Sequence, residues 1–236
     1  MRARSAVKII VVTGTDTGVG KSVFTALLLH HLRASGCQAL ALKPFCSGGR
    51  GDVNLLQSLQ PGELSDAECN PFYFPEPVAP LVAARKHGRK IRLAEVVRHI
   101  RKIASRCETL LVEGAGGLLA PLGEGFNLRD LIVRLQAHFY VQVIVVSGNK
   151  LGVINHVLLT VQVLKQVGLK RVSVVLTETR PGQKKDLASV TNPKILKEIL
   201  ETDVAKVPFL GRNCEKNGGL KKHLKFFKKT LARILN

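Results

Sequence analysis

Short apolar runs alternate with amphipathic stretches along most of the chain. Residues 8–13 and 141–146 are apolar and rich in β-branched side chains, which is typical of strands buried on both faces. Residues 93–104 instead place apolar side chains at helical spacing, with basic residues on the opposite face. Strands that alternate with helices in this way predict an α/β fold, with a mostly parallel sheet and helices on both of its faces.

The remaining elements follow from the same pattern. We predict strands at 8–13, 38–42, 109–112, 141–146, 172–176 and 204–207, and helices at 22–35, 93–104, 155–167, 193–200 and about 216–231. Polar residues 47–52 predict a loop, and four prolines within 71–80 predict a second, irregular one. The sequence contains neither an internal repeat nor a long linker, so residues 1–236 are predicted to form one domain.

The composition fits such a domain and favours the cytoplasm. Hydrophobic residues make up 45% of the 236 residues, enough for a full core. The apolar runs are far shorter than the roughly 18 residues of a membrane helix, and no signal peptide is recognisable at the start, so we expect no membrane association. The 5 cysteines are scattered and lack metal-site spacing, which indicates free thiols in a reducing compartment.

The net charge of +19 has two interpretations. Basic proteins often bind nucleic acid. Alternatively, the basic residues cover solvated faces without a specific partner. We favour the second interpretation and expect no nucleic-acid partner, because the charges are dispersed and aromatic residues make up only 5% of the chain.

A glycine-rich loop follows the first predicted strand. It begins at Gly14 and ends in Gly20-Lys21-Ser22, where the next helix begins. This strand–loop–helix arrangement is typical of a P-loop, in which backbone N–H groups surround phosphate oxygens, the lysine contacts the outer phosphates and the hydroxyl binds Mg²⁺. Five residues separate the two glycines, where the common pattern has four. The alternative, a glycine-rich turn with a chance lysine, explains the context less well.

Three charged residues follow later strands of the predicted sheet. Lys43 follows the second strand, Asp52 lies in the next polar loop, and Glu113 ends the third strand. Each has a simpler explanation: a solvated lysine, a helix-capping aspartate, and a capping or salt-bridged glutamate. Because the carboxyl ends of parallel strands meet at one edge of a sheet, we expect all three near the P-loop, with Ser22, Asp52 and Glu113 as Mg²⁺ ligands.

Four segments resemble the dethiobiotin synthetases. They are VTGTDTGVGKS at 12–22, KPFCSGG at 43–49, LVEGAGGLLAPL at 111–122 and KLGVINHVLLTVQVL at 150–164. The resemblance runs from about residue 12 to 215 and includes the five-residue gap of the P-loop. It implies a cytoplasmic, homodimeric ligase of biotin biosynthesis that uses ATP and Mg²⁺. Its substrates would be 7,8-diaminononanoate and CO₂ or bicarbonate, and its product dethiobiotin.

The resemblance also implies roles for individual residues. Lys21 and Lys43 would be catalytic, and Thr17 and Ser47 would bind the diamine or its carbamate. The residues expected at the nucleotide are Gly18, Val19, Gly20, Lys21, Ser22, Val23, Asp52, Glu113, Gly114, Ala115, Gly116, Thr177, Pro208, Phe209, Leu210 and Glu215. Many members of the family have glutamate where this chain has Gly18. Many also have an adenine-reading asparagine where it has Thr177, and because threonine offers one hydroxyl in place of the donor and acceptor of asparagine, nucleotide selectivity is expected to be looser.

Two other classes of protein fit parts of the pattern. ParA/MinD-like ATPases have a related P-loop and would suit a basic charge, but they carry an extra lysine early in the loop, where this chain has Asp16. Related amidoligases and cobyrinate-type synthases usually carry an additional glutaminase domain, for which 236 residues leave no room.

Overall fold

A six-stranded parallel sheet forms the centre of the molecule. The computed structural model describes residues 7–178, 186–202, 204–210 and 219–235, with side chains from residue 227 onward in the last range. The strand order is β10-β9-β8-β1-β5-β2. The strands are β1 (Lys8–Gly14), β2 (Ala39–Leu42), β5 (Thr109–Gly117), β8 (Tyr140–Gly148), β9 (Val172–Thr177) and β10 (Val204–Val207).

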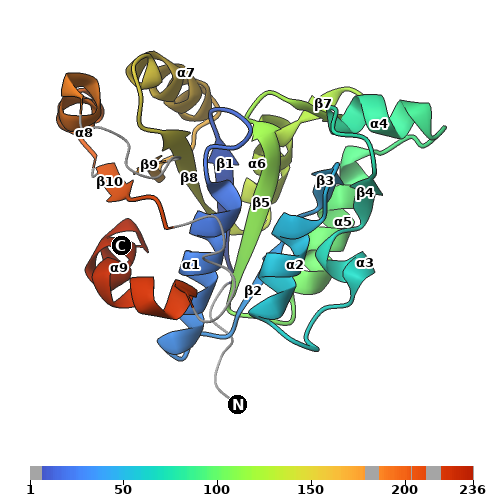
Figure 1. Ribbon diagram of the computed structural model, residues 1–236. Coiled ribbons are helices and arrows are strands. Elements are labelled where there is room, and N and C mark those ends of the chain that lie inside the picture. The colour runs from blue at the N-terminus through green and yellow to red at the C-terminus, as the bar shows by residue number, and fades with distance from the viewer. Residues whose placement is uncertain (1–6, 179–185, 203, 211–218, 236) are drawn as a thin grey trace.

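Helices cover both faces of this sheet (Figure 1). One face packs against α1 (Lys21–Ala34), α2 (Gly51–Ser58) and α9 (Gly219–Leu235). The other packs against α5 (Leu93–Ala104), α6 (Leu128–Gln136), α7 (Val153–Gln166) and α8 (Leu187–Leu200). The predicted α/β fold class is therefore confirmed.

The central strand β1 shows why its sequence is apolar at every position. Ile9 and Val11 belong to the core under α5–α8, whereas Ile10 and Val12 belong to the core under α1, α2 and α9. All four side chains are completely buried. A strand covered on both faces cannot alternate apolar and polar residues, so this pattern is the one expected of a parallel sheet.

Smaller elements surround the carboxyl end of the sheet and correct one prediction. Residues 71–80 are not entirely irregular, because Phe72–Phe74 forms β4, which pairs in parallel with β3 (Phe45–Ser47). The prolines at 71 and 75 flank this strand and leave its N–H groups free to bond. The other small elements are α3 (Asp66–Cys69), α4 (Pro80–Lys86), β6 (Pro121–Gly123) and β7 (Phe126–Asn127).

Two helices begin earlier than their sequences predicted. Helix α7 begins at Val153 instead of residue 155, directly after Gly152, whose φ of 90° lies in the left-handed region. Helix α8 begins at Leu187 and contains Pro193, which was predicted as its start. The Asp186 side chain accepts a hydrogen bond from the N–H of Ser189 at 2.7 Å and so caps the earlier start. Among the described residues, no helix has the length and apolar character needed to cross a membrane.

A side chain completes the edge of the sheet at β2. Gln60 is 1% exposed, and its amide both accepts from the N–H of Ala41 at 2.9 Å and donates to the carbonyl of Ala41 at 2.8 Å. This pair of bonds satisfies two backbone groups that an edge strand would otherwise leave without partners.

We predict that Gln60→Leu lowers the free energy of unfolding by about 1–3 kcal/mol, because it leaves the buried N–H of Ala41 unpaired and its carbonyl with only the weak Cys69 thiol contact. Thermal or urea unfolding measures the effect. The matched control is Gln57→Leu, which removes an exposed hydrogen bond to Asp66 and should cost less than about 0.5 kcal/mol. Equal stabilities of the two variants would contradict this account of the edge.

Candidate active site

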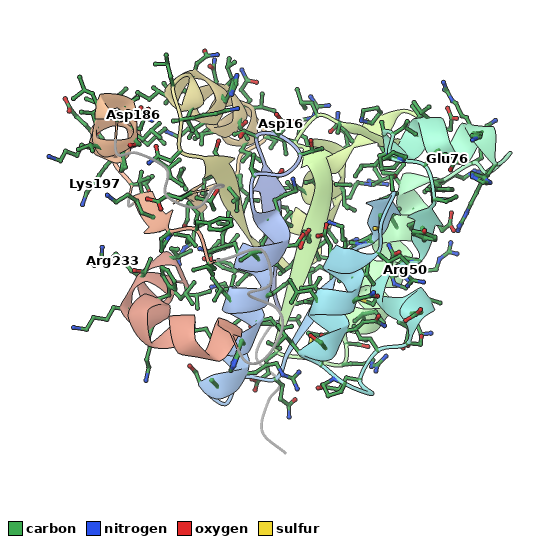
Figure 2. All side chains as sticks on the ribbon, in the orientation of Figure 1. Asp16, Arg50, Glu76, Asp186, Lys197 and Arg233 are labelled. Carbon is green, nitrogen blue, oxygen red and sulfur yellow. The ribbon has the colours of Figure 1, made fainter. Side chains whose placement is uncertain are left out.

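The predicted P-loop segment, residues 14–22, connects β1 to α1 at the carboxyl edge of the sheet. Figure 2 shows Asp16 on this loop, beyond the end of β1. Gly20 has a φ of 89° and ends the loop immediately before the helix. A Cβ on Gly14 would lie 2.8 Å from the Lys21 Nζ, so only glycine lets the lysine fold back over the loop. The Lys21 Nζ there donates to the carbonyl of Asp16 at 2.7 Å.

Successive backbone N–H groups of the loop have no hydrogen-bond acceptor. Within the described part of the chain, the N–H groups of residues 18–22 donate no hydrogen bond. The first internal bond of the helix runs from the N–H of Phe24 to the carbonyl of Gly20 at 3.0 Å. Successive free N–H groups at a helix N-terminus form an anion site, because their dipoles point to the same place and the helix adds partial positive charge.

Glu113 lies beside this loop and receives two donors from neighbouring strands. Its Oε1 accepts from the Ser22 hydroxyl at 2.6 Å and from the Lys43 Nζ at 2.5 Å. The sheet register explains the contact, since Val12 of β1 pairs with Glu113 and Leu42 of β2 pairs with Val112. Lys43, one residue beyond Leu42, therefore emerges next to Glu113. Glu113 does not end its strand as predicted, because β5 continues to Gly117.

Asp52 joins the same group from a helix. The sequence predicted a loop at residues 47–52, but Gly51–Ser58 forms α2, and Asp52 lies in its first turn. Its Oδ2 lies 2.8 Å from the Lys43 Nζ. A carboxylate is favourable at a helix N-terminus, so this position suits the helix as well as the site. Lys43 thus forms ion pairs with both predicted metal-binding carboxylates, which matches the salt-bridged alternative for Glu113.

The two lysines have opposite electrostatic environments. Burial, aided by the charge of Lys43, lowers the pKa of Lys21 to about 8. Burial also disfavours the charged form of Lys43, but Glu113 and Asp52 outweigh it and raise the pKa of Lys43 above its usual range. For Asp52, the effect of burial is outweighed by Lys43 and Ser22, so its pKa is lowered. Lys43 and Asp52 therefore stay charged at neutral pH, whereas Lys21 titrates just above it.

A cavity of about 770 Å³ opens over these groups. It is lined by eleven of the predicted residues, namely Thr17, Gly18, Gly20, Lys21, Ser22, Val23, Lys43, Ser47, Asp52, Ala115 and Gly116. The structure thus brings together segments from the ends of β1, β2 and β5. A second cavity, of about 690 Å³, lies among Lys170, Arg171, Lys197 and Arg233 and contains no predicted site residue.

Several predicted residues do not line this cavity. Glu113 reaches it only through its contacts with Ser22 and Lys43, and Gly114 packs against Leu128. Thr177 is buried at the end of β9, with its hydroxyl on the carbonyl of Val19. Residues 208–210 follow β10, at the far edge of the sheet, and stay predictions for the nucleotide base. Glu215 lies outside the described residues.

Sequence reasoning missed one wall of the cavity. Phe45, Pro77, Val78, Ala79 and Pro80 add apolar surface opposite the P-loop segment. The signal was present in the prolines of 71–80, which keep this segment out of a helix until α4 begins at Pro80. A Cβ on Gly48 would lie 3.2 Å from Pro77, so the loop after β3 packs closely against this wall.

The fold and the donor-rich loop define a P-loop α/β protein, and comparisons with known proteins agree. A family model described as an AAA domain matches residues 8–212. Among solved structures, the MinC:MinD cell division protein complex of Aquifex aeolicus matches with a TM-score of 0.62 at 15% identity, over 97% of this chain and 96% of that one. MinD of the same organism matches with a TM-score of 0.59 at 14% identity, over 97% of both chains. Identities this low show the fold alone.

Curated relatives are much closer in sequence. The ATP-dependent dethiobiotin synthetase BioD of Bacillus licheniformis is 38% identical over 207 residues, 85% of this chain and 83% of that protein. The BioD proteins of Akkermansia muciniphila and Bacillus subtilis are 36% and 34% identical, over 82% and 85% of this chain and 88% and 84% of their own lengths. The chain belongs to the AAA domain family and, within it, to the dethiobiotin synthetases, which confirms the predicted resemblance.

The lowered pKa of Lys21 predicts proton uptake when a triphosphate binds. Near pH 8 the lysine of the free protein is about half protonated, and a bound anion favours its charged form, so binding of ATP beside Lys21 should take up about half a proton per site. Uptake should approach zero near pH 6.5, because the lysine is then already charged. Calorimetry in buffers of different ionisation enthalpy measures this quantity.

Lys21→Arg is the control for this measurement, because arginine is charged throughout the range and should take up no proton. Equal uptake by the wild-type protein and Lys21→Arg at pH 8 would assign the titration to another group.

Proposed function

We propose that this protein is a dethiobiotin synthetase that uses Mg-ATP to join CO₂ to 7,8-diaminononanoate and close a cyclic urea. One observation supports the proposal above the others: Lys43, Ser22 and Glu113 converge beside a free row of phosphate-binding N–H groups, in a chain that belongs to this family. We also propose that the protein is cytoplasmic, because scattered free thiols are typical of proteins in a reducing compartment.

The chemistry requires activation of a poor leaving group. One amine adds to CO₂ and loses a proton, giving a carbamate. A carbamate oxygen then takes the γ-phosphoryl group of ATP and releases ADP. The second amine attacks the carbonyl carbon and loses a proton, phosphate leaves, and the urea ring closes. Each step builds or moves negative charge, so positioning and charge stabilisation are the main tasks of the protein.

The P-loop segment is the triphosphate site in this proposal. Residues 18–22 supply the free N–H groups, and Lys21 supplies a cation within the same cavity. Lys21 now donates to the carbonyl of Asp16, at the end of a flexible side chain, and can exchange that neutral acceptor for a phosphate oxygen. Such an exchange favours the phosphate because a charge-assisted bond is stronger than one to a carbonyl.

The residues beside this loop fit a magnesium ion. The Glu113 Oε2 is buried and has no hydrogen-bond partner among the described residues, although a buried carboxylate oxygen is costly to leave unpaired. Ser22 and Asp52 add a hydroxyl and a second carboxylate next to it. Oxygen ligands of this kind, completed by phosphate and water, suit Mg²⁺. The described residues contain no cluster of three His, Cys, Asp or Glu, so the set differs from an all-protein metal cage.

When bound, the ion would neutralise phosphate charge, while Lys43 acts on the other substrate. Its two carboxylate partners keep it protonated and direct its Nζ into the cavity, where it can stabilise the carbamate and the phosphorylated carbamate. Thr17 and Ser47 lie at the same cavity, and the buried Ser47 hydroxyl has no partner among the described residues. We assign these hydroxyls to the diamine or its carbamate, and the apolar wall formed by Phe45 and residues 77–80 to its hydrocarbon chain.

The decisive experiment follows phosphate release from ATP with the diamine and bicarbonate, together and separately. We expect release that depends on both substrates and a cyclic urea product detected by mass spectrometry. Release without the diamine, or none at all, would contradict the named reaction and leave the fold assignment unaffected.

We predict that Lys43→Ala lowers kcat by about 100-fold or more, because it removes the cation that faces the developing charge. The variant also leaves Glu113 without its cation, so its unfolding should be measured alongside. Lys102→Ala, on the exposed face of α5, is the control and should keep wild-type kcat. A folded Lys43→Ala protein with a wild-type rate would remove Lys43 from the site.

The homodimer implied by the resemblance belongs to this proposal too. Helices α7 and α8 lie side by side (Figure 1). These helices and the turn before α7 carry several exposed apolar side chains. Leu151 is 84% and Leu159 55% exposed, and Leu187 and Val190 add to this surface from α8. Apolar side chains in such numbers favour a protein partner, and a second copy of the chain is the one we propose.

Leu159→Glu should therefore convert a dimer to a monomer in sedimentation velocity experiments, because it introduces charge into an apolar contact. Val133→Glu, at an exposed position of α6, is the control and should leave the mass unchanged. A wild-type protein that sediments as a monomer at micromolar concentration would contradict the dimer.

A further inference from the structure

Thr177 at the end of β9 touches the P-loop segment across 158 residues of sequence. Its side chain is buried, with 5% exposure. The Oγ1 lies 2.7 Å from the carbonyl oxygen of Val19 and 3.3 Å from that of Ser147. A threonine hydroxyl has one hydrogen, and the shorter contact has the better hydrogen-bond distance. Thr177 therefore donates to the carbonyl of Val19.

This bond fixes the direction of a neighbouring N–H group. All described peptide bonds are trans, so the carbonyl of Val19 and the N–H of Gly20 point in opposite directions across one peptide plane. With the carbonyl directed at Thr177, the N–H of Gly20 faces away from Thr177, towards the cavity that Gly20 lines. That N–H donates no hydrogen bond within the described residues, so it is available to a ligand.

A peptide next to glycine needs such an anchor. Glycine adopts positive and negative φ at similar cost, so the peptide plane before Gly20, which has a φ of 89°, can rotate more easily than most. The Thr177 side chain also packs against Gly20, because a Cβ on Gly20 would be 3.3 Å from the Thr177 Cγ2 and 3.5 Å from its Oγ1. Thr177 thus restricts rotation of the peptide before Gly20 both by packing and by its hydrogen bond.

The anchor itself is fixed to the sheet. The carbonyl of Thr177 accepts from the N–H of Asn149 at 2.8 Å, and Thr177 pairs with Gly148 of β8. The start of the loop is attached to β8 as well. The N–H of Thr15 donates a hydrogen bond to the carbonyl of Val146, and the hydroxyls of Thr15 and Ser147 lie 2.6 Å apart. The loop is therefore connected to β8 near its start and to β9 near its end.

We propose that Thr177 is a positioning residue for the triphosphate: it orients the 19–20 peptide so that the N–H of Gly20 binds a phosphate oxygen. This inference rests on the proposed use of ATP in this cavity and deepens it. Because the single hydroxyl hydrogen is already donated to Val19, Thr177 acts through the phosphates and has none left for a nucleotide base. Its effect should therefore be independent of the base.

The test compares Thr177→Val, which keeps the shape and loses the hydroxyl, with Thr177→Ser, which keeps the hydroxyl. Equilibrium dissociation constants are measured by calorimetry for Mg-ATP, Mg-GTP and inorganic tripolyphosphate with Mg²⁺. We expect Thr177→Val to weaken all three by a similar factor of about tenfold, since it disorients one phosphate donor. Thr177→Ser should stay within about threefold of the wild-type protein.

The control is Thr191→Val, which removes an exposed threonine hydroxyl bond of the same length, 2.7 Å, to the carbonyl of Leu187 within α8. It should leave all three dissociation constants unchanged, and melting curves of all variants should show that each is folded. Binding by Thr177→Val equal to wild type would overturn the inference. Weaker binding of Mg-ATP with unchanged binding of tripolyphosphate would also overturn it, because Thr177 would then act on the nucleotide base.

An equal loss in Thr177→Ser would also overturn it, since the hydroxyl would then not be the cause. These outcomes are distinct from failure of the proposed function, because binding is measured without the diamine or bicarbonate. A wild-type protein that binds neither ATP nor tripolyphosphate would overturn both proposals, whereas one that binds them but forms no cyclic urea would overturn the reaction alone.

Discussion

The ion pair between Lys43 and Glu113 is the contact on which the site depends. Glu113 is 1% exposed within a central strand, where an unpaired carboxylate would be strongly unfavourable. Lys43 supplies the opposite charge from the neighbouring strand, and Ser22 supplies a hydrogen bond from α1. Removal of Lys43 would leave the buried carboxylate of Glu113 without a cation. The contacts with Lys43 and Ser22 therefore tie β5 to the end of β2 and to the start of α1.

Charge balance explains why the site can accept a polyanion. Two lysines and two carboxylates, at positions 21, 43, 52 and 113, roughly cancel one another, and the uncompensated positive potential comes from the free N–H groups of residues 18–22. These groups are fixed dipoles, which need no rearrangement when a phosphate arrives. The low pKa of Lys21 is consistent with this arrangement, because it is a buried cation whose nearest strong acceptor is a neutral carbonyl.

The sequence predicted those parts of the site that depend on local pattern. The P-loop segment is recognisable from the glycines, Lys21 and Ser22, and the alternation of strands and helices placed Lys43 and Glu113 at one edge of the sheet. Helix α2 was missed altogether, because Gly51 and Asp52 look like loop residues and the core contacts of Val53, Leu55 and Leu56 appear only in the structure. Strand β4 was missed because the prolines around it predict a loop, whereas its pairing with β3 and the burial of Phe72 and Phe74 are tertiary contacts that a local pattern does not show.

Thr177 shows a different limit of sequence reasoning. Its place after a strand suggested a role beside the nucleotide base, but a pattern cannot tell which acceptor a buried hydroxyl chooses. That choice depends on the pairing of β9 with β8 and of β8 with β1, which brings position 177 beneath Gly20. MinD of Aquifex aeolicus, at 14% identity, shares the fold alone. In the proposed function, the loop and its anchor hold the triphosphate of ATP. The reaction must then be set by what faces that loop: Lys43 after β2, and the apolar wall that residues 77–80 place across the cavity.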